Sequence, residues 1–259
     1  MSHFDVKFLD KNSERYMLSK RIMQFCSDIK SERFITQSEG TGDFLYRDGQ
    51  YTFAQRNEGE WTPFDCDRDY WGYRECYCWF KQTVKVPAQF AGQAVYYKII
   101  PYLSEWRTTN PQLIIYVNGK MIQGMDSNHQ DVIITNNAKA GEEFEIYINA
   151  HADAREFKSE LKMKAQIFTV DPIAVKLYFD LITPLEVANL YSGDSNERVN
   201  LVKALNTAVN MVDLDAIDVE DFRNSAKNAC DYLEKEVYGK KGEATAYCVG
   251  HTHIDVAWL

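Results

Sequence analysis

The sequence lacks several features that would place a protein in a class at once. Its first residues show no basic segment followed by an apolar one, so no secretory signal is expected. No run approaches the roughly 18 apolar residues that a membrane-spanning helix requires. Positive charge is also scarce, because 29 Lys and Arg stand against 38 Asp and Glu and leave a net charge of −9. These absences predict a cytoplasmic protein with no membrane and no nucleic-acid partner.

Cysteine is sparse as well, and the six residues form no disulfide framework. Without an export signal, their thiols are expected to be reduced. Cys76 and Cys78 stand two residues apart and would share one face of a strand. Two cysteines at this spacing are by themselves only weak evidence for a metal-binding site, so we expect both side chains to pack in the core.

Aromatic residues, in contrast, are abundant, with 16 Tyr, 14 Phe and 5 Trp in 259 residues. Such side chains suit the half-buried surface of a pleated sheet, so a large β component is expected. The length allows one large domain or two smaller ones.

The N-terminal segment, residues 1–41, is predicted to be helical. Apolar residues recur at helical spacing over 12–30, with charged residues between them. Asn12 or Ser13 could cap this helix.

Residues 42–170 predict an antiparallel β-sandwich of galactose-binding or jelly-roll type. Short apolar runs are separated by Gly, Pro, Asn and Asp, and Asn118-Gly119 is a strong hairpin signal. The loop 57–73 is rich in Trp, Asp and Arg, and is either functional or packed. The expected strands are 78–86, 93–102, 112–117, 130–135, 143–150 and 165–170.

Residues 171–241 predict a connector of three helices. The first would begin at Asp171-Pro172 and run to about residue 191. Asp194, with Glu197 three residues later, resembles a capping box for the second. Asp218 would cap the third, which would end at Gly239 as a C-terminal glycine cap.

Residues 242–259 begin with a short apolar run, 244–249, of the kind that forms a buried parallel strand. Such a strand needs partners for its backbone groups. We therefore expect it to be the first strand of an α/β barrel catalytic domain that continues past the given sequence.

Two histidines and an aspartate follow that strand at alternate positions: His251, His253 and Asp255. In extended backbone these side chains point the same way. Imidazole and carboxylate together suit Zn²⁺, and barrel enzymes place reactive groups at strand ends. The alternative to a metal site is that the two histidines occur together by chance and make only local hydrogen bonds. The other histidines, His3, His129 and His151, are expected to be structural or solvated.

The segment 249–259, VGHTHIDVAWL, resembles the motif that opens the catalytic domain of class II α-mannosidases, glycoside hydrolase family 38. The resemblance implies that His253 and Asp255 bind the catalytic zinc, that Trp258 forms part of the mannose subsite, and that His251 supports them. Segments 80–87, 111–120 and 123–129 are similar to the N-terminal sandwich of cytosolic-type members.

The resemblance implies a retaining, zinc-dependent enzyme that hydrolyses terminal α-D-mannosyl residues of oligosaccharides and glycans. Its two further zinc ligands, its nucleophile and its acid/base carboxylate match no position in this sequence. A retaining glycosidase needs two carboxylates at the scissile bond, so the chain by itself is expected to be inactive.

Two other functions stay open. A metal-dependent amidohydrolase or phosphoesterase would use His251 and His253 together on its metal, but that reading explains neither the long sandwich nor Trp258. The second open function is non-catalytic: the sandwich would bind carbohydrate or buttress a barrel. The sequence permits a homo-oligomer without requiring one.

Overall fold

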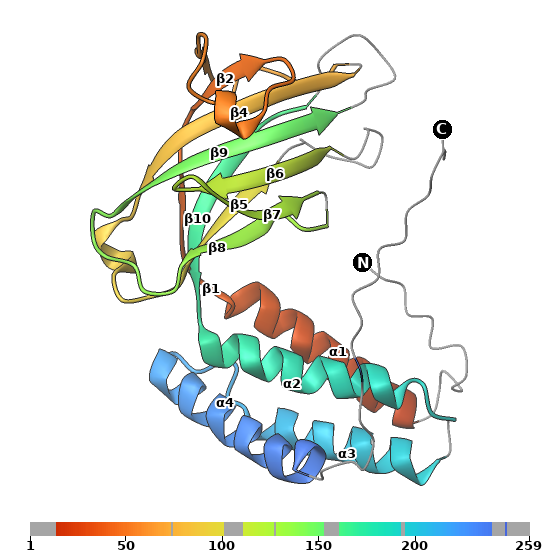
Figure 1. Ribbon diagram of the computed structural model, residues 1–259. Helices are drawn as coiled ribbons and strands as arrows, with labels where there is room; N and C mark the ends of the chain where they lie inside the picture. The colour runs from red at the N-terminus through yellow and green to blue at the C-terminus, as the bar shows by residue number, and fades with distance from the viewer. Residues whose placement is uncertain are drawn as a thin grey trace. The chain divides into compact units, whose positions relative to one another are not determined.

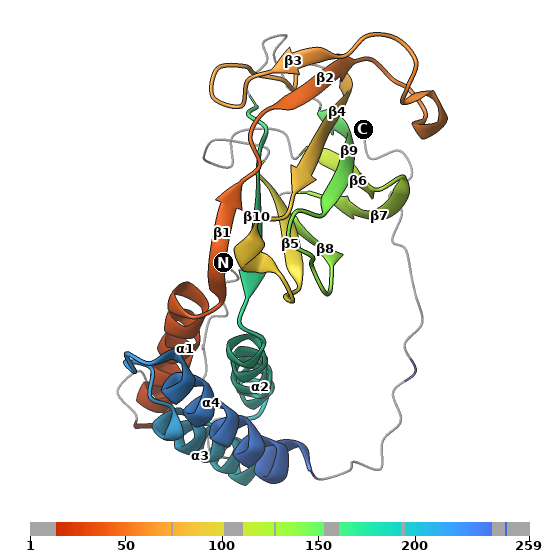
Figure 2. The ribbon, with the colours of Figure 1, turned by 90° about the vertical axis from the view of Figure 1, so that its left-hand side faces the viewer.

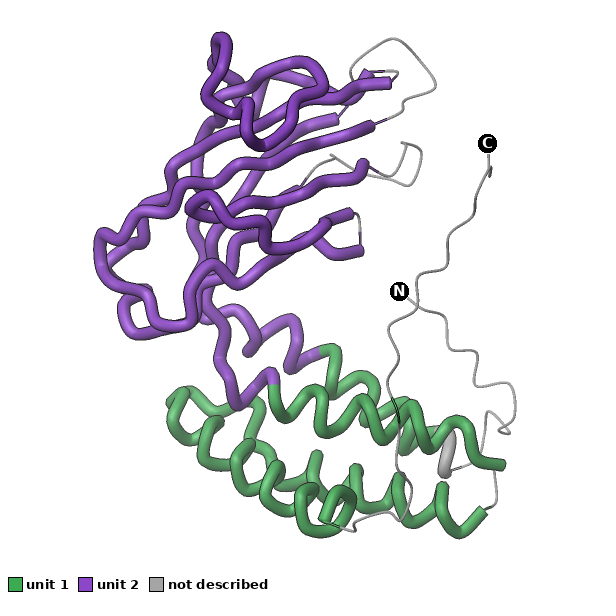
Figure 3. The backbone as a smooth tube through the Cα atoms, in the orientation of Figure 1, with its two compact units in different colours: residues 1–27, 176–259 green, residues 28–175 purple. Residues whose placement is uncertain are grey.

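The computed structural model describes residues 14–73, 75–100, 111–126, 128–152, 161–192, 195–239 and residue 247. The chain divides into two compact units, one of residues 28–175 and one of residues 1–27 with 176–259 (Figure 3). Among the described helices, none has the length and apolar character needed to cross a membrane.

The unit of residues 28–175 holds two antiparallel sheets (Figure 1; Figure 2). The four-stranded sheet has the order β1-β10-β5-β8, and the six-stranded sheet has the order β3-β2-β4-β9-β6-β7. The antiparallel sandwich predicted from the sequence is confirmed. The strand bounds, in chain order, are β1 Ile35–Gly40, β2 Phe44–Asp48, β3 Thr62–Phe64, β4 Cys76–Lys85, β5 Val95–Ile100, β6 Gln112–Val117, β7 Lys120–Met125, β8 Asp131–Thr135, β9 Glu143–Ala152 and β10 Lys164–Val170.

The core of the sandwich follows from period-two alternation along its two longest strands. β4 and β9 pair over their whole length, from Cys76 opposite Ala152 to Lys85 opposite Glu143. Phe80, at the middle of β4, is fully buried. Its ring lies 5.2–5.7 Å from four other aromatic rings, mostly edge to face, which is a favourable arrangement for such pairs. These partners are Phe44, Tyr46, Phe64 and Trp71.

The hairpin signal at Asn118-Gly119 is also confirmed. Both residues have positive φ, 48° and 82°, and they join β6 to β7 with Val117 opposite Lys120. The sequence analysis missed β1, β2 and β3. β1 is an edge strand with almost no buried side chain, so it has no alternation of apolar and polar residues to detect.

The unit of residues 1–27 and 176–259 is helical. The four α-helices of the described chain are α1 Glu14–Glu32, α2 Pro172–Ala188, α3 Asn196–Met211 and α4 Val219–Leu233. The boundary between the units falls inside α1 and α2, and α3 lies against α4 (Figure 1). Arg21 of α1 donates hydrogen bonds to Asn206 and, at 2.7 Å, to Asn210 of α3. The Tyr238 hydroxyl donates to the Asp180 carbonyl of α2 at 3.1 Å.

Helix starts agree with the sequence at two of three positions. Asp171 accepts from the N–H of Ile173 at 3.0 Å, and Asp218 accepts from the N–H of Glu220 at 2.8 Å. At α3 the cap is Ser195, whose hydroxyl accepts from the N–H of Arg198 at 3.2 Å. Asp194 lies outside the described residues.

The predicted glycine cap at Gly239 is wrong. Its φ is −68°, so it is right-handed, and α4 continues into a π turn over Glu234–Tyr238. A Cβ at this position would lie 2.9 Å from the Glu234 carbonyl oxygen. A glycine fits here because the backbone at the end of the π turn lies too close to the Glu234 carbonyl for a side chain, and no left-handed conformation is involved.

Arg198 connects α3 to the end of α2. Its buried guanidinium donates to the carbonyl of Ala188 and, at 3.1 Å, to the side chain of Asn189. A cation at a helix C-terminus also interacts favourably with the helix dipole.

We expect Arg198→Ala to lower the free energy of unfolding by about 2 kcal/mol, because it leaves the buried acceptors unpaired. Urea denaturation followed by circular dichroism measures the change. Arg223→Ala is the control, since its ion pair with Glu220 lies at the surface and such a pair contributes less than about 0.5 kcal/mol. Equal losses in the two variants would contradict the role assigned to Arg198.

Candidate functional site

The motif residues His251, His253, Asp255 and Trp258 lie outside the described residues, as does the strand expected before them. Their zinc-binding and substrate-binding roles stay predictions. Within the described part of the chain, no group of three or more His, Cys, Asp or Glu side chains could hold a metal ion. The candidate features that the structure itself offers lie in the sandwich.

The loop 57–73 is packed against the sandwich. Trp71 is 1% exposed, and its indole N–H donates to the Lys162 carbonyl at 3.2 Å. The backbones of Trp71 and Leu161 bond to each other at 2.9 and 3.0 Å. The Trp61 indole donates to the Arg56 carbonyl at 3.2 Å. Both indole donors are thus used inside the protein.

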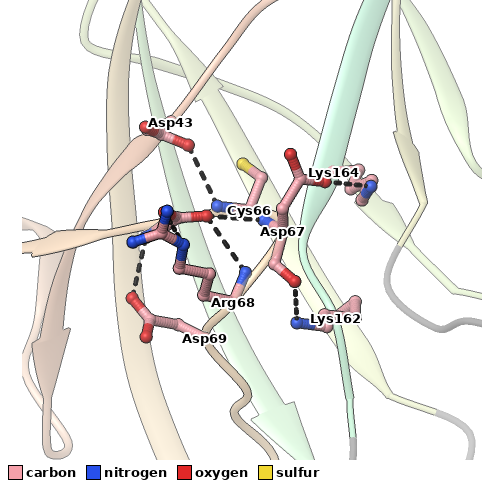
Figure 4. A network of polar contacts seen from close by, with 8 residues as sticks. Asp43, Cys66, Asp67, Arg68, Asp69, Lys162 and Lys164 are labelled. Atoms are coloured by element: carbon pink, nitrogen blue, oxygen red, sulfur yellow. Dashed lines mark hydrogen bonds and ion pairs between the residues drawn. The ribbon is translucent and has the colours of Figure 1, made fainter.

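The Asp and Arg side chains of this loop also make hydrogen bonds and ion pairs within the unit. Figure 4 shows Asp67 between Lys162 and Lys164, whose ammonium groups bond to its carbonyl at 2.7 Å and its carboxylate at 2.6 Å. The hydrogen bond and the charge of Lys164 hold the pKa of Asp67 below its usual range. Asp65 accepts from the N–H of Asp67 at 2.8 Å. This network ties the loop to β10 and to the residues that precede it.

Cys76 and Cys78 are both fully buried in the core between the sheets, so the predicted packing role is confirmed. A hydrogen bond with Cys78 lowers the pKa of Cys76 to about 7, while burial raises that of Cys78. Neither sulfur is accessible, so thiol chemistry is not expected here.

The outer face of the six-stranded sheet points away from the core and has two parts. The first is covered by the segment between β2 and β3. Phe53 of this segment stacks on Tyr116 of β6, with 4.1 Å between ring centres and 8° between planes. It also contacts Tyr147 of β9 edge to face at 5.8 Å. These rings form a small apolar cluster that stabilises the cover.

The second part of the outer face is an open hollow of about 320 Å³ over β6, β7 and β9. Strand register explains its position. Ile114 of β6 stands opposite Asn149 of β9 on one side and Gly124 of β7 on the other. Because Gly124 has no side chain, this row of outward residues ends in a depression. Gln112 and His151 form the next row along the same strands.

Polar groups with free hydrogen-bonding capacity face this hollow. Within the described chain, the Asn149 amide and the His151 imidazole have no hydrogen-bond partner, and both line the hollow. The His151 ring packs on Tyr77 of β4 with 4.4 Å between centres.

The turn after β7 supplies another wall. Asp126 accepts from the N–H groups of Asn128 and His129, each at 2.8 Å, and contacts the His129 imidazole at 3.0 Å. Burial acts to raise the pKa of Asp126, but these hydrogen bonds outweigh it and hold the pKa below its usual range. Asp126 is therefore ionised and fixed in place at neutral pH.

Sequence reasoning missed the hollow. His129 and His151 were expected to be structural or solvated, and both also line the hollow. The alternation of β9 could have placed Asn149 and His151 on one face. The missing signal was the pairing of β6 with β7, which sets Gly124 beside them.

A family model described as the jelly roll domain of α-mannosidase matches residues 44–182, more than half of the chain. The matched span contains both sheets except β1. Among curated proteins, the chain is similar to alpha-mannosidase G of Dictyostelium discoideum, with 24% identity over 205 residues. That match covers 70% of this chain, and the chain spans only 17% of the relative's length.

Solved structures of glycosidases show a weaker similarity. A β-glucuronidase from Ruminococcus gnavus shares 9% identity at a TM-score of 0.34, covering 54% of this chain and 30% of that one. A β-glucuronidase from Faecalibacterium prausnitzii shares 11% identity at a TM-score of 0.36, and the match covers 53% of this chain and 32% of that one. A putative β-galactosidase from Bacteroides fragilis shares 15% identity at a TM-score of 0.35, and the match covers 51% of this chain and 23% of that one. Scores at this level say nothing about what this chain does.

Proposed function

This chain belongs to the family of α-mannosidase jelly roll domains, and we propose that the protein of which it forms part hydrolyses terminal α-D-mannosyl residues of oligosaccharides. One observation carries the proposal: the family match over 44–182 and the motif HTHIDVAW at 251–258 occur in one chain. The two segments are independent in sequence, and both resemble the same class of enzyme.

We propose that His253 and Asp255 hold a zinc ion, with His251 supporting them and Trp258 at the mannose subsite. The donor set fits, because imidazole nitrogen and carboxylate oxygen are ordinary zinc ligands. When bound, zinc would orient sugar hydroxyls and support charge at the reacting centre. The described residues offer no competing cluster of three or more ligands.

These two ligands alone would make a weak site, since structural and catalytic zinc sites use three or four protein ligands. A retaining mechanism also needs a nucleophile and an acid/base carboxylate that flank the scissile bond. The proposal therefore assigns turnover to the complete protein and expects none from the 259-residue chain.

The complete protein should hydrolyse an aryl α-mannoside, lose that activity in a chelator and regain it when Zn²⁺ is added back. Release of the aryl alcohol, followed by absorbance, measures the rate. The 259-residue chain under the same conditions is the control and should show no release. Hydrolysis of an amide or a phosphoester in place of the mannoside would contradict the proposal and favour the alternative metal-dependent hydrolase.

A further inference from the structure

We propose that the hollow on the outer face of the six-stranded sheet binds a pyranose ring, as a non-catalytic carbohydrate site. The proposal stands on the hollow itself, where Gly124 leaves a space beside Ile114 and where the side chains of Asn149 and His151, which have no hydrogen-bond partner among the described residues, contribute to the lining. The identity of the sugar as an α-mannoside rests on the proposed function.

The size of the hollow suits one small ring. Its volume of about 320 Å³ is at the lower end of the range for small-molecule pockets, about 300–1,000 Å³. The exposed side chain of Ile114 gives it an apolar floor; Leu113 and Met125 also border it, but their side chains are buried in the core. A pyranose presents C–H groups on its ring face and hydroxyl groups around its edge, so an apolar floor with a polar rim is complementary to it.

The rim supplies both donors and acceptors of hydrogen bonds. The Asn149 amide offers two N–H donors and one carbonyl acceptor, and the His151 imidazole offers ring nitrogens that can take part in hydrogen bonds with hydroxyl groups. A sugar hydroxyl likewise donates one hydrogen bond and accepts others, so adjacent hydroxyls can engage such mixed groups. His151 is held by its ring contact with Tyr77 at 4.4 Å, which limits the freedom that it would lose on binding.

The charges around the hollow disfavour other classes of small ligand. No Lys or Arg is found among the described residues that line it, so it offers an anion no cation for an ion pair. Asp126 is the one carboxylate among the described residues that line it, and its Oδ1 already accepts from two backbone N–H groups and contacts the His129 imidazole, so the hollow lacks the several oxygen ligands that a cation such as Ca²⁺ needs. A neutral ligand rich in hydroxyl groups fits what remains.

The test uses the 259-residue chain and two probes, methyl α-D-mannopyranoside and α-linked mannobiose. Titration followed by NMR chemical shifts should show saturable binding that does not change when a chelator is added, because no group of three or more His, Cys, Asp or Glu side chains in the described part of the chain could hold a metal ion. Gly124→Leu should weaken binding by about tenfold or more, which corresponds to about 1.4 kcal/mol. Its Cβ would meet only the Leu113 carbonyl at 3.8 Å, so the fold accommodates the change while the side chain fills the hollow.

Gly40→Leu is the matched control. Gly40 also lies in a strand without positive φ and has nothing within 4 Å of an added Cβ, but it belongs to the other sheet. Binding in this variant should stay within about twofold of the wild type. Asn149→Ala should weaken binding without changing the urea midpoint, since the amide makes no hydrogen bond in the described structure.

Absence of saturable binding, or binding that Gly124→Leu leaves unchanged, would overturn the proposal. Its failure is distinct from failure of the proposed function. A complete protein that lacks α-mannosidase activity, while the chain binds the probes and Gly124→Leu abolishes binding, would overturn the enzyme assignment and leave the carbohydrate site intact.

Discussion

Replacing His253 or Asp255 with alanine in the complete protein is expected to reduce α-mannosidase activity by more than about a hundredfold. Residues that only support a zinc ligand typically contribute about 10–100-fold, so loss of a ligand should exceed that range. Both variants should also lose bound zinc, which elemental analysis of the purified protein measures. The two readouts together separate loss of the metal from loss of a substrate contact.

His251 distinguishes the two hydrolase hypotheses. If it supports the ligands, as the mannosidase proposal holds, His251→Ala should retain zinc and lose about 10–100-fold in activity. Thr252→Ala is the control, because alternation points this side chain the opposite way, and it should keep both zinc and activity. Zinc lost from His251→Ala but retained in Asp255→Ala would contradict the mannosidase assignment and favour a metal site built on both histidines.

Gly72→Ala is expected to lower the free energy of unfolding by about 3 kcal/mol. Gly72 has φ of +80°, which disfavours any residue with a Cβ. An added Cβ would also lie 2.4 Å from Cδ1 and 2.8 Å from Cγ of Leu161. Leu161 cannot easily move, because it is buried and its backbone bonds to Trp71 on both sides. Overpacking of this kind adds about 1–3 kcal/mol to the conformational cost.

Gly92→Ala isolates the conformational part of that cost. Gly92 has nearly the same φ, +81°, but nothing lies within 4 Å of an added Cβ. We expect it to lose only about 1 kcal/mol. Urea denaturation followed by tryptophan fluorescence measures both variants, since Trp71 and Trp79 are buried reporters in the same sandwich. Equal losses would mean that Leu161 relaxes away, and the close approach at Gly72 would then contribute nothing.

Periodicity predicted most of the secondary structure because those elements bury one face. β4, β6 and β9 alternate between core and outer face, and their sequences show it. Asn118-Gly119 predicted its hairpin because the turn requires two residues of positive φ. β1 and β3 were not predicted, since edge strands with exposed side chains carry no such pattern.

The division of the chain into parts at residues 41, 170 and 241 stays a prediction. So do the zinc ligands His253 and Asp255, which lie outside the described residues. The sequence could propose them because donor type and spacing are local properties: alternate residues on an extended segment point the same way without any help from the rest of the fold.

By itself, then, the sequence determined features that depend on neighbours along the chain: an antiparallel sandwich and helices that begin at Asp171 and Asp218. The metal-binding motif depends on the same local spacing and stays a prediction. The tertiary structure decided whether polar side chains meet across strands. It closed the loop 57–73 around its own Trp and Asp groups. It also set Gly124 and Asn149 on either side of Ile114, which opened the hollow. The reason is that strand register pairs Ile114 with residues 10 and 35 positions further along the chain, Gly124 and Asn149, and no local pattern encodes that pairing.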